Sequence, residues 1–495
     1  SMPPTPPVAA NKVIITFLRR GLTHVSSRRA PAPRARWRGL PGKLTADEAR
    51  TGRPPASLRS GAFRALFGSM TPSPSRSSLR YSRDPDTGSP LALVAASYLS
   101  LFPLLLLFSF NVKGARATGA DAFVALVVLV ALGQWLARGF GRGRREEGKG
   151  EGPSREAPEK LPVPFAGALA ALGGYALWVG LSALWSDSPE YAFLKGMGLL
   201  ALVAGAAGVA TSGLGWGRAA DAWLTGTGVV LGFSLLALVV PSGLGEWMTY
   251  GGGGVSGLPL PRLKATFSHP NALGDYLLIS AGLLWARWPE YSGTGRRWAW
   301  VLAGLMALAF LGAVTTAWVG VGGLLLGLAV AGGRGRRALM GLGATLTVVA
   351  LAAVLLSFRL PVPGLEIHAA GVRPEIWASA LSTYATSPFL GVGATPDLAA
   401  APAPGSETMA LTLWDAHSLY LSVLGQYGVA GFVLFFGGFS VLVWSYLKGD
   451  PGRRRTAVLA ILLALALHGL VTASEDMRHL WAFVGVVGLG GGGRG

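Results

Sequence analysis

Long apolar runs separated by polar loops make up most of the chain after its first ninety residues. The windows Leu91 to Phe110 and Leu339 to Ser357 contain no charged residue. A helix of about 20 apolar residues crosses the roughly 30 Å of hydrocarbon in a bilayer. We therefore predict an all-α polytopic membrane protein with about twelve transmembrane helices, at residues 91–110, 120–137, 163–184, 193–211, 222–240, 272–286, 298–313, 315–333, 338–357, 419–447, 456–473 and 479–490.

Residues 1–90 have a different pattern. They are rich in Pro, Arg and Ser and show no sustained apolar period, which predicts a basic, largely disordered tail. The short apolar piece Val13 to Leu18 is too brief for a secretory signal peptide. The predicted domains are thus this tail and a transmembrane domain over residues 91–495.

The distribution of Lys and Arg predicts the orientation of the spans. These residues collect in the loops after even-numbered runs, for example residues 138–160 and 448–455, and in the N-terminal tail. We place those loops and both termini in the cytoplasm. The loops after odd-numbered runs, including residues 241–271 and the long loop 358–416, then face outward.

The composition supports a membrane protein and excludes several site types. The chain is 51% hydrophobic and 14% charged, with a net charge of +19 and no Cys. The basic residues lie in tails and short loops, a pattern that favours membrane topology and anionic lipids over nucleic acid. Without Cys there is no disulfide, no Cys–zinc site and no thiol nucleophile.

The predicted spans contain few ionisable residues. Asp275 and His468 are the two that fall well inside apolar runs. A buried His usually serves packing, and the alternative is a proton relay. Several embedded charges and internal repeats are typical of transporters, and we detect neither. The polar residues are concentrated in the outer loops instead.

Three outer loops carry candidate chemistry. Residues 181–195 fit a structural turn that caps a helix. Arg262 and Lys264 stand on the outer side against the topological rule, either as lipid-headgroup contacts or as ligands of a phosphorylated lipid. In the long loop, Arg373 and Trp377 lie on one face of a predicted amphipathic helix.

The chain re-enters the membrane through "LWDAHSLYLSVLGQYGVAG". This segment places Asp415 and His417 at the start of an apolar run. Gly425, Gly428 and Gly431 follow at intervals of three, which predicts a closely packed helix face.

Four segments together resemble the O-antigen ligase and O-antigen polymerase family. They are "LSALWSDSPEYA", "TFSHPNALGDYL", "RPEIWASALSTYATSPFLGVG" and "AHSLYLSVLGQYGVAG". The chain departs from the family at two places: Ser418 follows His417 where relatives carry Asn, and "TTAWVG" stands where many relatives carry Ser-Arg.

The resemblance implies a glycosyltransferase at the periplasmic face of the bacterial inner membrane. Its donor would be an undecaprenyl-diphosphate-linked glycan, and its acceptor lipid A–core or another glycan. By the resemblance, Arg262 and Arg373 bind the donor's diphosphate and His417 is essential for transfer. Asp415 is a rival base, a partner of His417 or a helix cap. We assign substrate binding to residues in or beside these segments, namely Lys264, His269, Asn271 and Trp377.

The carboxylates of the outer loops show no close pair of the kind that holds a catalytic divalent metal. Arginines can neutralise a leaving diphosphate as fixed charges. We therefore expect neither a metal nor another cofactor. The leading function is O-antigen ligase; polymerase, glycan transfer to protein, a transporter or flippase, and a scaffold are the alternatives.

Overall fold

The computed structural model describes residues 89–112, 115–142, 162–239, 248–250, 262–312, 315–330, 335–356, 373–402, 411–449 and 451–489. All of them belong to one unit, residues 62–495. The predicted N-terminal tail lies outside the described residues except for its last two positions. The division into a tail and a membrane domain therefore stays a prediction.

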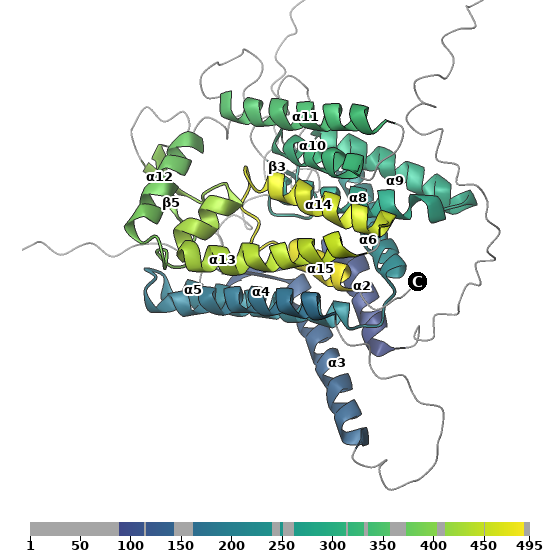
Figure 1. Cartoon of the computed structure of the whole chain (residues 1–495), viewed down its shortest axis with the longest axis horizontal. Helices are drawn as coiled ribbons and strands as arrows, with labels where there is room; N and C mark the ends of the chain where they lie inside the picture. The colour runs from purple at the N-terminus through teal and green to yellow at the C-terminus, as the bar shows by residue number, and fades with distance from the viewer. Residues whose placement is uncertain are drawn as a thin grey trace, which may run out of the picture. The chain divides into compact units, whose positions relative to one another are not determined.

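Each predicted apolar run coincides with an α-helix in the described part of the chain (Figure 1). These helices are α2 (Pro90–Leu105), α3 (Gly119–Arg142), α4 (Val163–Leu181), α5 (Pro189–Ala210), α6 (Trp216–Val239), α8 (Pro270–Arg287), α9 (Gly293–Gly312), α10 (Thr315–Val330), α11 (Arg336–Leu356), α13 (Leu419–Lys448), α14 (Arg453–His468) and α15 (Arg478–Gly488). A further helix, α12 (Arg373–Thr386), forms where the sequence predicts an amphipathic loop helix. The mostly helical architecture is confirmed.

Several of these helices suit a membrane. Among the described residues, four segments are long and apolar enough to cross a bilayer, and two shorter helices are also apolar. The four are Gly119–Ala137, Val163–Leu184, Pro189–Ala210 and Leu419–Lys448, and the two are Pro90–Leu105 and Thr316–Val330. The full set of twelve crossings and the location of the termini stay predictions.

Three short antiparallel hairpins connect the helices. They are β1 (Ser109–Val112) with β2 (Ala115–Thr118), β3 (Thr249–Tyr250) with β4 (Arg262–Leu263), and β5 (Ala399–Pro402) with β6 (Leu411–Trp414). The first hairpin corrects the predicted end of the first run, because α2 stops at Leu105 and residues 109–112 are a strand. All three hairpins lie in loops after odd-numbered runs, on the side predicted to be outer.

The helices pack closely through small residues. Helix α4 lies between α13 and α5, and α10 packs against α11 and α14. A Cβ atom on Gly196 of α5 would lie 2.4 Å from the Cα of Gly180 in α4. A Cβ on Gly327 of α10 would lie 2.4 Å from the Cα of Ala460 in α14. Small residues at such contacts let helix backbones approach each other, as in other membrane bundles.

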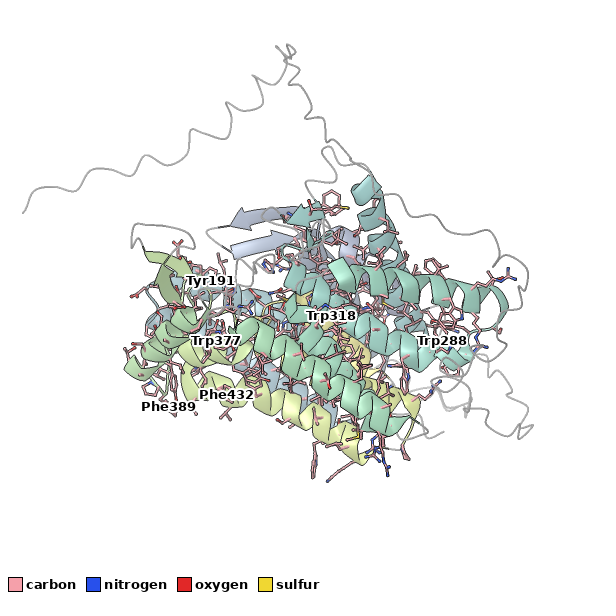
Figure 2. The ribbon with its side chains drawn as sticks, turned by 90° about the horizontal axis from the view of Figure 1, so that it is seen from above. Tyr191, Trp288, Trp318, Trp377, Phe389 and Phe432 are labelled. Atoms are coloured by element: carbon pink, nitrogen blue, oxygen red, sulfur yellow. The ribbon has the colours of Figure 1, made fainter. Side chains whose placement is uncertain are left out.

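Aromatic residues mark the two ends of the bundle. Figure 2 shows Tyr191, Trp377 and Phe389 at one end and Trp288 at the other. The first three belong to loops predicted to be outer, or to the helix starts beside them, and Trp288 follows an even-numbered run. Tyr and Trp are enriched at both membrane–water interfaces; the orientation of the two ends stays a prediction.

Helix α13 is interrupted at Gly428, whose φ of 63° and ψ of −166° are not helical. The loop after α12 supplies backbone hydrogen-bond partners at this interruption. Val392 and Gly393 donate backbone hydrogen bonds to the carbonyls of Gly425 (3.0 Å) and Gln426 (2.8 Å), and Val429 donates to Pro388 (2.9 Å). A broken helix inside a membrane requires such substitute partners. The glycine repeat is thus closely packed, and Gly428 also forms a break that its spacing does not predict.

Replacing Gly428 with Ala is expected to destabilise the protein by about 1–3 kcal/mol, because its backbone conformation suits glycine almost alone. The new Cβ would also lie 2.2 Å from the carbonyl oxygen of Phe389. Gly437→Ala is the matched control on the same helix, since a Cβ there meets no atom within 4 Å. Thermal unfolding in detergent should show a lower midpoint for Gly428→Ala alone. Equal midpoints for the two variants would contradict the assigned backbone conformation.

Candidate active site

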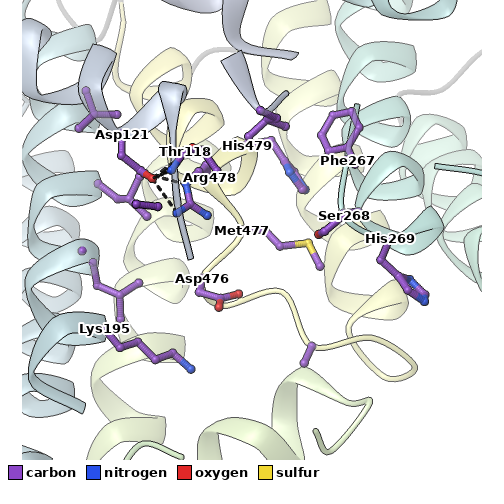
Figure 3. Close-up of a pocket in the computed structure, with 18 of the residues that line it drawn as sticks. Thr118, Asp121, Lys195, Phe267, Ser268, His269, Asp476, Met477, Arg478 and His479 are labelled. Atoms are coloured by element: carbon purple, nitrogen blue, oxygen red, sulfur yellow. Dashed lines mark hydrogen bonds and ion pairs between the residues drawn. The ribbon is translucent and has the colours of Figure 1, made fainter. Parts of the chain in front are cut away.

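A cavity of about 610 Å³ opens among the ends of several helices (Figure 3). Its wall combines residues of α2, β2, α3, α5, α8 and α15 with the segments that precede α8, α13 and α15. Polar lining residues include Lys195, His269, His417, Asp476, Arg478 and His479. Residues far apart in the sequence therefore share one space large enough for part of a substrate.

His417 and Asp415 form a hydrogen-bonded pair on this wall. The His417 Nδ1 lies 2.7 Å from Asp415 Oδ1, and the His417 backbone N–H donates to the same oxygen at 2.7 Å. Because a carboxylate only accepts hydrogen bonds, Nδ1 carries the hydrogen of this contact, and in the neutral ring the lone pair is then on Nε2. The His417 side chain is 23% exposed, so the ring is held in place and still accessible.

The local backbone also fixes the position of this histidine. His417 has a φ of +46°, in the left-handed region that non-glycine residues rarely adopt. The N-cap of α13 is Ser418, and its side chain makes no capping hydrogen bond. Three roles are predicted for Asp415. In the structure its carboxylate contacts the ring and the backbone of His417, which are the contacts expected of a partner of that histidine.

The environment keeps the Asp415 carboxylate charged. Partial burial tends to raise its pKa, but the hydrogen bonds from the side chain and the backbone of His417 outweigh this and hold the pKa below its ordinary value. The carboxylate therefore remains an acceptor for the histidine ring at neutral pH.

His269 and Asn271 also line the cavity. His269 is the N-cap of α8, and its Nδ1 accepts a hydrogen bond from the Asn271 backbone at 3.2 Å. The buried Asn271 side chain accepts a hydrogen bond from Thr316 at 2.9 Å. The structure thus brings four of the predicted residues together: Asp415, His417, His269 and Asn271.

The other predicted residues lie elsewhere. Arg373 is 4% exposed at the start of α12, and Trp377 is half-buried against the small apolar cluster around Ile376. Lys264 is half-buried after β4. None of these three is among the cavity-lining residues. Arg262 pairs with Tyr250 in the β3–β4 hairpin, and its side chain lies outside the described part of the structure.

The cavity-lining residue Lys195 belongs to an ion pair that the sequence did not indicate. Lys195, in the second turn of α5, lies 3.2 Å from Glu475 in the loop before α15, and both side chains are less than a tenth exposed. Glu475 Oε1 also accepts a hydrogen bond from Ser422 of α13 at 3.0 Å. Burial raises the pKa of the Glu475 carboxyl, although the Lys195 ammonium acts in the opposite direction. The predicted orientation places residues 181–195 and the loop before α15 on the same, outer side. No other feature of the sequence indicates that Lys195 and Glu475 are close.

A second ion pair borders the cavity. Arg478 binds Asp121 through two hydrogen bonds, of 2.6 Å from Nε and 2.7 Å from Nη2. Thr118 adds donors to the same carboxylate through its backbone (2.6 Å) and hydroxyl (3.1 Å). This bidentate arrangement joins α15 to the start of α3 and engages the guanidinium strongly.

The two embedded ionisable residues predicted from the sequence are each other's partners. Asp275 of α8 and His468 of α14 approach to 2.5 Å, and both are buried. His479 of α15 lies nearby, with its Nε2 3.9 Å from Asp275 Oδ2. The hydrogen bond engages His468 Nδ1, whereas His468 Nε2 and Asp275 Oδ2 have no hydrogen-bond partner among the described residues, so a packing role for His468 stays a prediction.

Among the described residues, no group of three or more His, Asp or Glu side chains is placed to hold a metal ion. In comparisons with known proteins, residues 277–436 match the family model described as O-antigen ligase. The matched segment runs from within α8 into α13 and therefore includes both Asp415 and His417. The comparison with curated proteins found no match.

Proposed function

We propose that this chain is an O-antigen ligase family enzyme, the family that residues 277–436 match. In this proposal it transfers a glycan from an undecaprenyl-diphosphate donor to a sugar hydroxyl. The proposed acceptor is lipid A–core, and the proposed location is the periplasmic face of the inner membrane with both termini in the cytoplasm. The observation that carries the proposal is the Asp415–His417 pair on the wall of a 610 Å³ cavity.

In the proposed mechanism, His417 acts as a general base. Its Nε2 takes the proton of the acceptor hydroxyl while the hydroxyl oxygen attacks the anomeric carbon of the donor sugar. The bond from that carbon to the diphosphate oxygen breaks, and the oxygen keeps the electron pair. Asp415 holds the ring in the proton-accepting tautomer and stabilises the positive charge that forms on it.

The departing diphosphate needs positive charge around it. On the resemblance, Arg262 and Arg373 supply this charge from the outer loops. In the structure Arg373 is buried at the start of α12 and does not line the cavity. The role of these arginines in donor binding remains a proposal, and a donor that extends beyond the cavity would be needed for Arg373 to contact it.

The acceptor is tested by reconstituting the full chain in vesicles with one defined lipid-linked glycan. Lipid A–core is supplied in one reaction and a second lipid-linked repeat unit in another. A ligase glycosylates lipid A–core, whereas a polymerase lengthens the lipid-linked glycan. Products formed only in the second reaction would replace the ligase assignment with polymerase.

Activity is expected to persist in EDTA, because fixed protein cations are proposed to neutralise the leaving diphosphate. The measurement compares initial rates of glycan transfer with and without an excess of EDTA. A parallel reaction with EDTA and added Mg²⁺ controls for effects of the chelator itself. Loss of activity in EDTA that Mg²⁺ restores would contradict the metal-independent mechanism.

A further inference from the structure

Lys195 has hydrogen-bonding capacity that the described residues do not fill. An ammonium group has three N–H donors. Among the described residues, Glu475 Oε1 accepts one of its hydrogen bonds at 3.2 Å, and the Tyr427 side chain is a further hydrogen-bonding partner. The side chain is 8% exposed, and Lys195 lines the cavity that also contains His417. One N–H group of this buried cation therefore remains for a ligand at the cavity wall.

The position of this ammonium group is well defined. Its nitrogen lies 5.8 Å from the ring centres of both Tyr191 and Tyr427. Glu475 Oε1 accepts hydrogen bonds from both Lys195 of α5 and Ser422 of α13. Ser422 lies in the first turn of α13, five residues after His417, so a single carboxylate links the cation to the helix that begins beside the proposed base.

The other charges on the wall differ in their availability. Arg478 is engaged in two hydrogen bonds to Asp121, and Asp415 is bonded to His417. Asp476 is exposed and adds a negative charge beside Lys195, as Figure 3 shows. Lys195 is therefore the cation of the described wall that has a donor to spare for an anionic ligand.

We propose that Lys195 contacts the diphosphate of the lipid-linked donor and that Glu475 holds its ammonium group at the cavity wall. An ammonium group is a common ligand of phosphate oxygens because it acts as a compact point charge with several donors. Near His417 it would stabilise the negative charge that develops on the leaving oxygen. The inference rests on the proposed function, since it assigns one residue to the donor used there.

The test measures binding of undecaprenyl diphosphate and of undecaprenol to the full chain in nanodiscs. Lys195→Met alone would leave the buried Glu475 without its counter-charge and endanger folding. The informative variant is therefore Lys195→Met with Glu475→Gln, and Glu475→Gln alone is its matched control because it keeps the cation. Thermal unfolding midpoints are measured for both variants to check that they fold.

The double variant is expected to bind the diphosphate lipid about tenfold to a hundredfold more weakly, which corresponds to loss of a hydrogen bond to a charged group. Binding of undecaprenol should not change. Glu475→Gln should bind the diphosphate about as tightly as the wild type, because the Gln Oε1 still accepts the hydrogen bonds of Lys195 and Ser422 that position the ammonium group. A double variant with wild-type affinity, or an equal loss in Glu475→Gln alone, overturns the role of Lys195. A wild-type chain without preference for the diphosphate instead contradicts the proposed donor.

Discussion

Replacing His417 with Ala is expected to lower the rate of glycan transfer by about a hundredfold to ten-thousandfold, the usual contribution of a general base. The substitution removes the imidazole that would accept the proton of the acceptor hydroxyl. Donor binding should change little, because the histidine is assigned to the acceptor side of the reaction. The rate is measured with a defined lipid-linked donor at saturating concentration, so that a loss in turnover is separated from a loss in affinity.

Two controls accompany this variant. The thermal unfolding midpoint of His417→Ala should match that of the wild type, since the side chain is partly exposed and its loss leaves no unpaired buried charge. Gly437→Ala, on the same helix and without close neighbours, should retain full activity. A folded His417→Ala variant that transfers glycan at the wild-type rate would eliminate His417 as the base.

Asp415→Asn is the second large effect, expected on the order of tenfold to a hundredfold in turnover. Asn can present its NH₂ group to Nδ1, which favours the tautomer whose Nε2 carries a hydrogen and cannot accept a proton. Where the carboxylate of a Ser-His-Asp triad is fully buried, the same substitution lowers turnover about ten-thousandfold by this route. A smaller loss is expected here because the Asp415 side chain is 50% exposed and water can partly replace it.

Asp397→Asn is the matched control for Asp415→Asn, because Asp397 is an exposed carboxylate of the same long loop that does not line the cavity. It should leave turnover unchanged. The comparison also separates the two possible bases. If Asp415→Asn loses all transfer while a folded His417→Ala variant keeps it, Asp415 is the base and the proposed roles are reversed.

The sequence predicted the helices well because each apolar run must satisfy its own backbone hydrogen bonds in a membrane. It did not predict the interruption at Gly428. The partners of the broken helix come from residues 388–393, and no local signal in α13 indicates that a distant loop will replace its hydrogen bonds. A glycine repeat alone predicts close packing, whether or not the helix continues through it.

The candidate site was predicted in part. Asp415 and His417 are neighbours in the sequence, so their pairing could be anticipated as one of several alternatives. Lys195 and Glu475 are 280 residues apart, and only the packing of α5, α13 and the loop before α15 brings them together. The amphipathic pattern of α12 predicted a helix, but it did not reveal that Arg373 would be buried.

The most direct test of the central claim is the fate of the donor lipid in a reconstituted reaction. Mass spectrometry would measure the glycosylated acceptor and the released lipid together, with the wild-type chain and with His417→Ala. We predict one undecaprenyl diphosphate released for each glycan transferred by the wild type, and neither product above background with His417→Ala. Donor that crosses the bilayer intact, with no bond cleaved and no acceptor glycosylated, would contradict the account and favour a transporter.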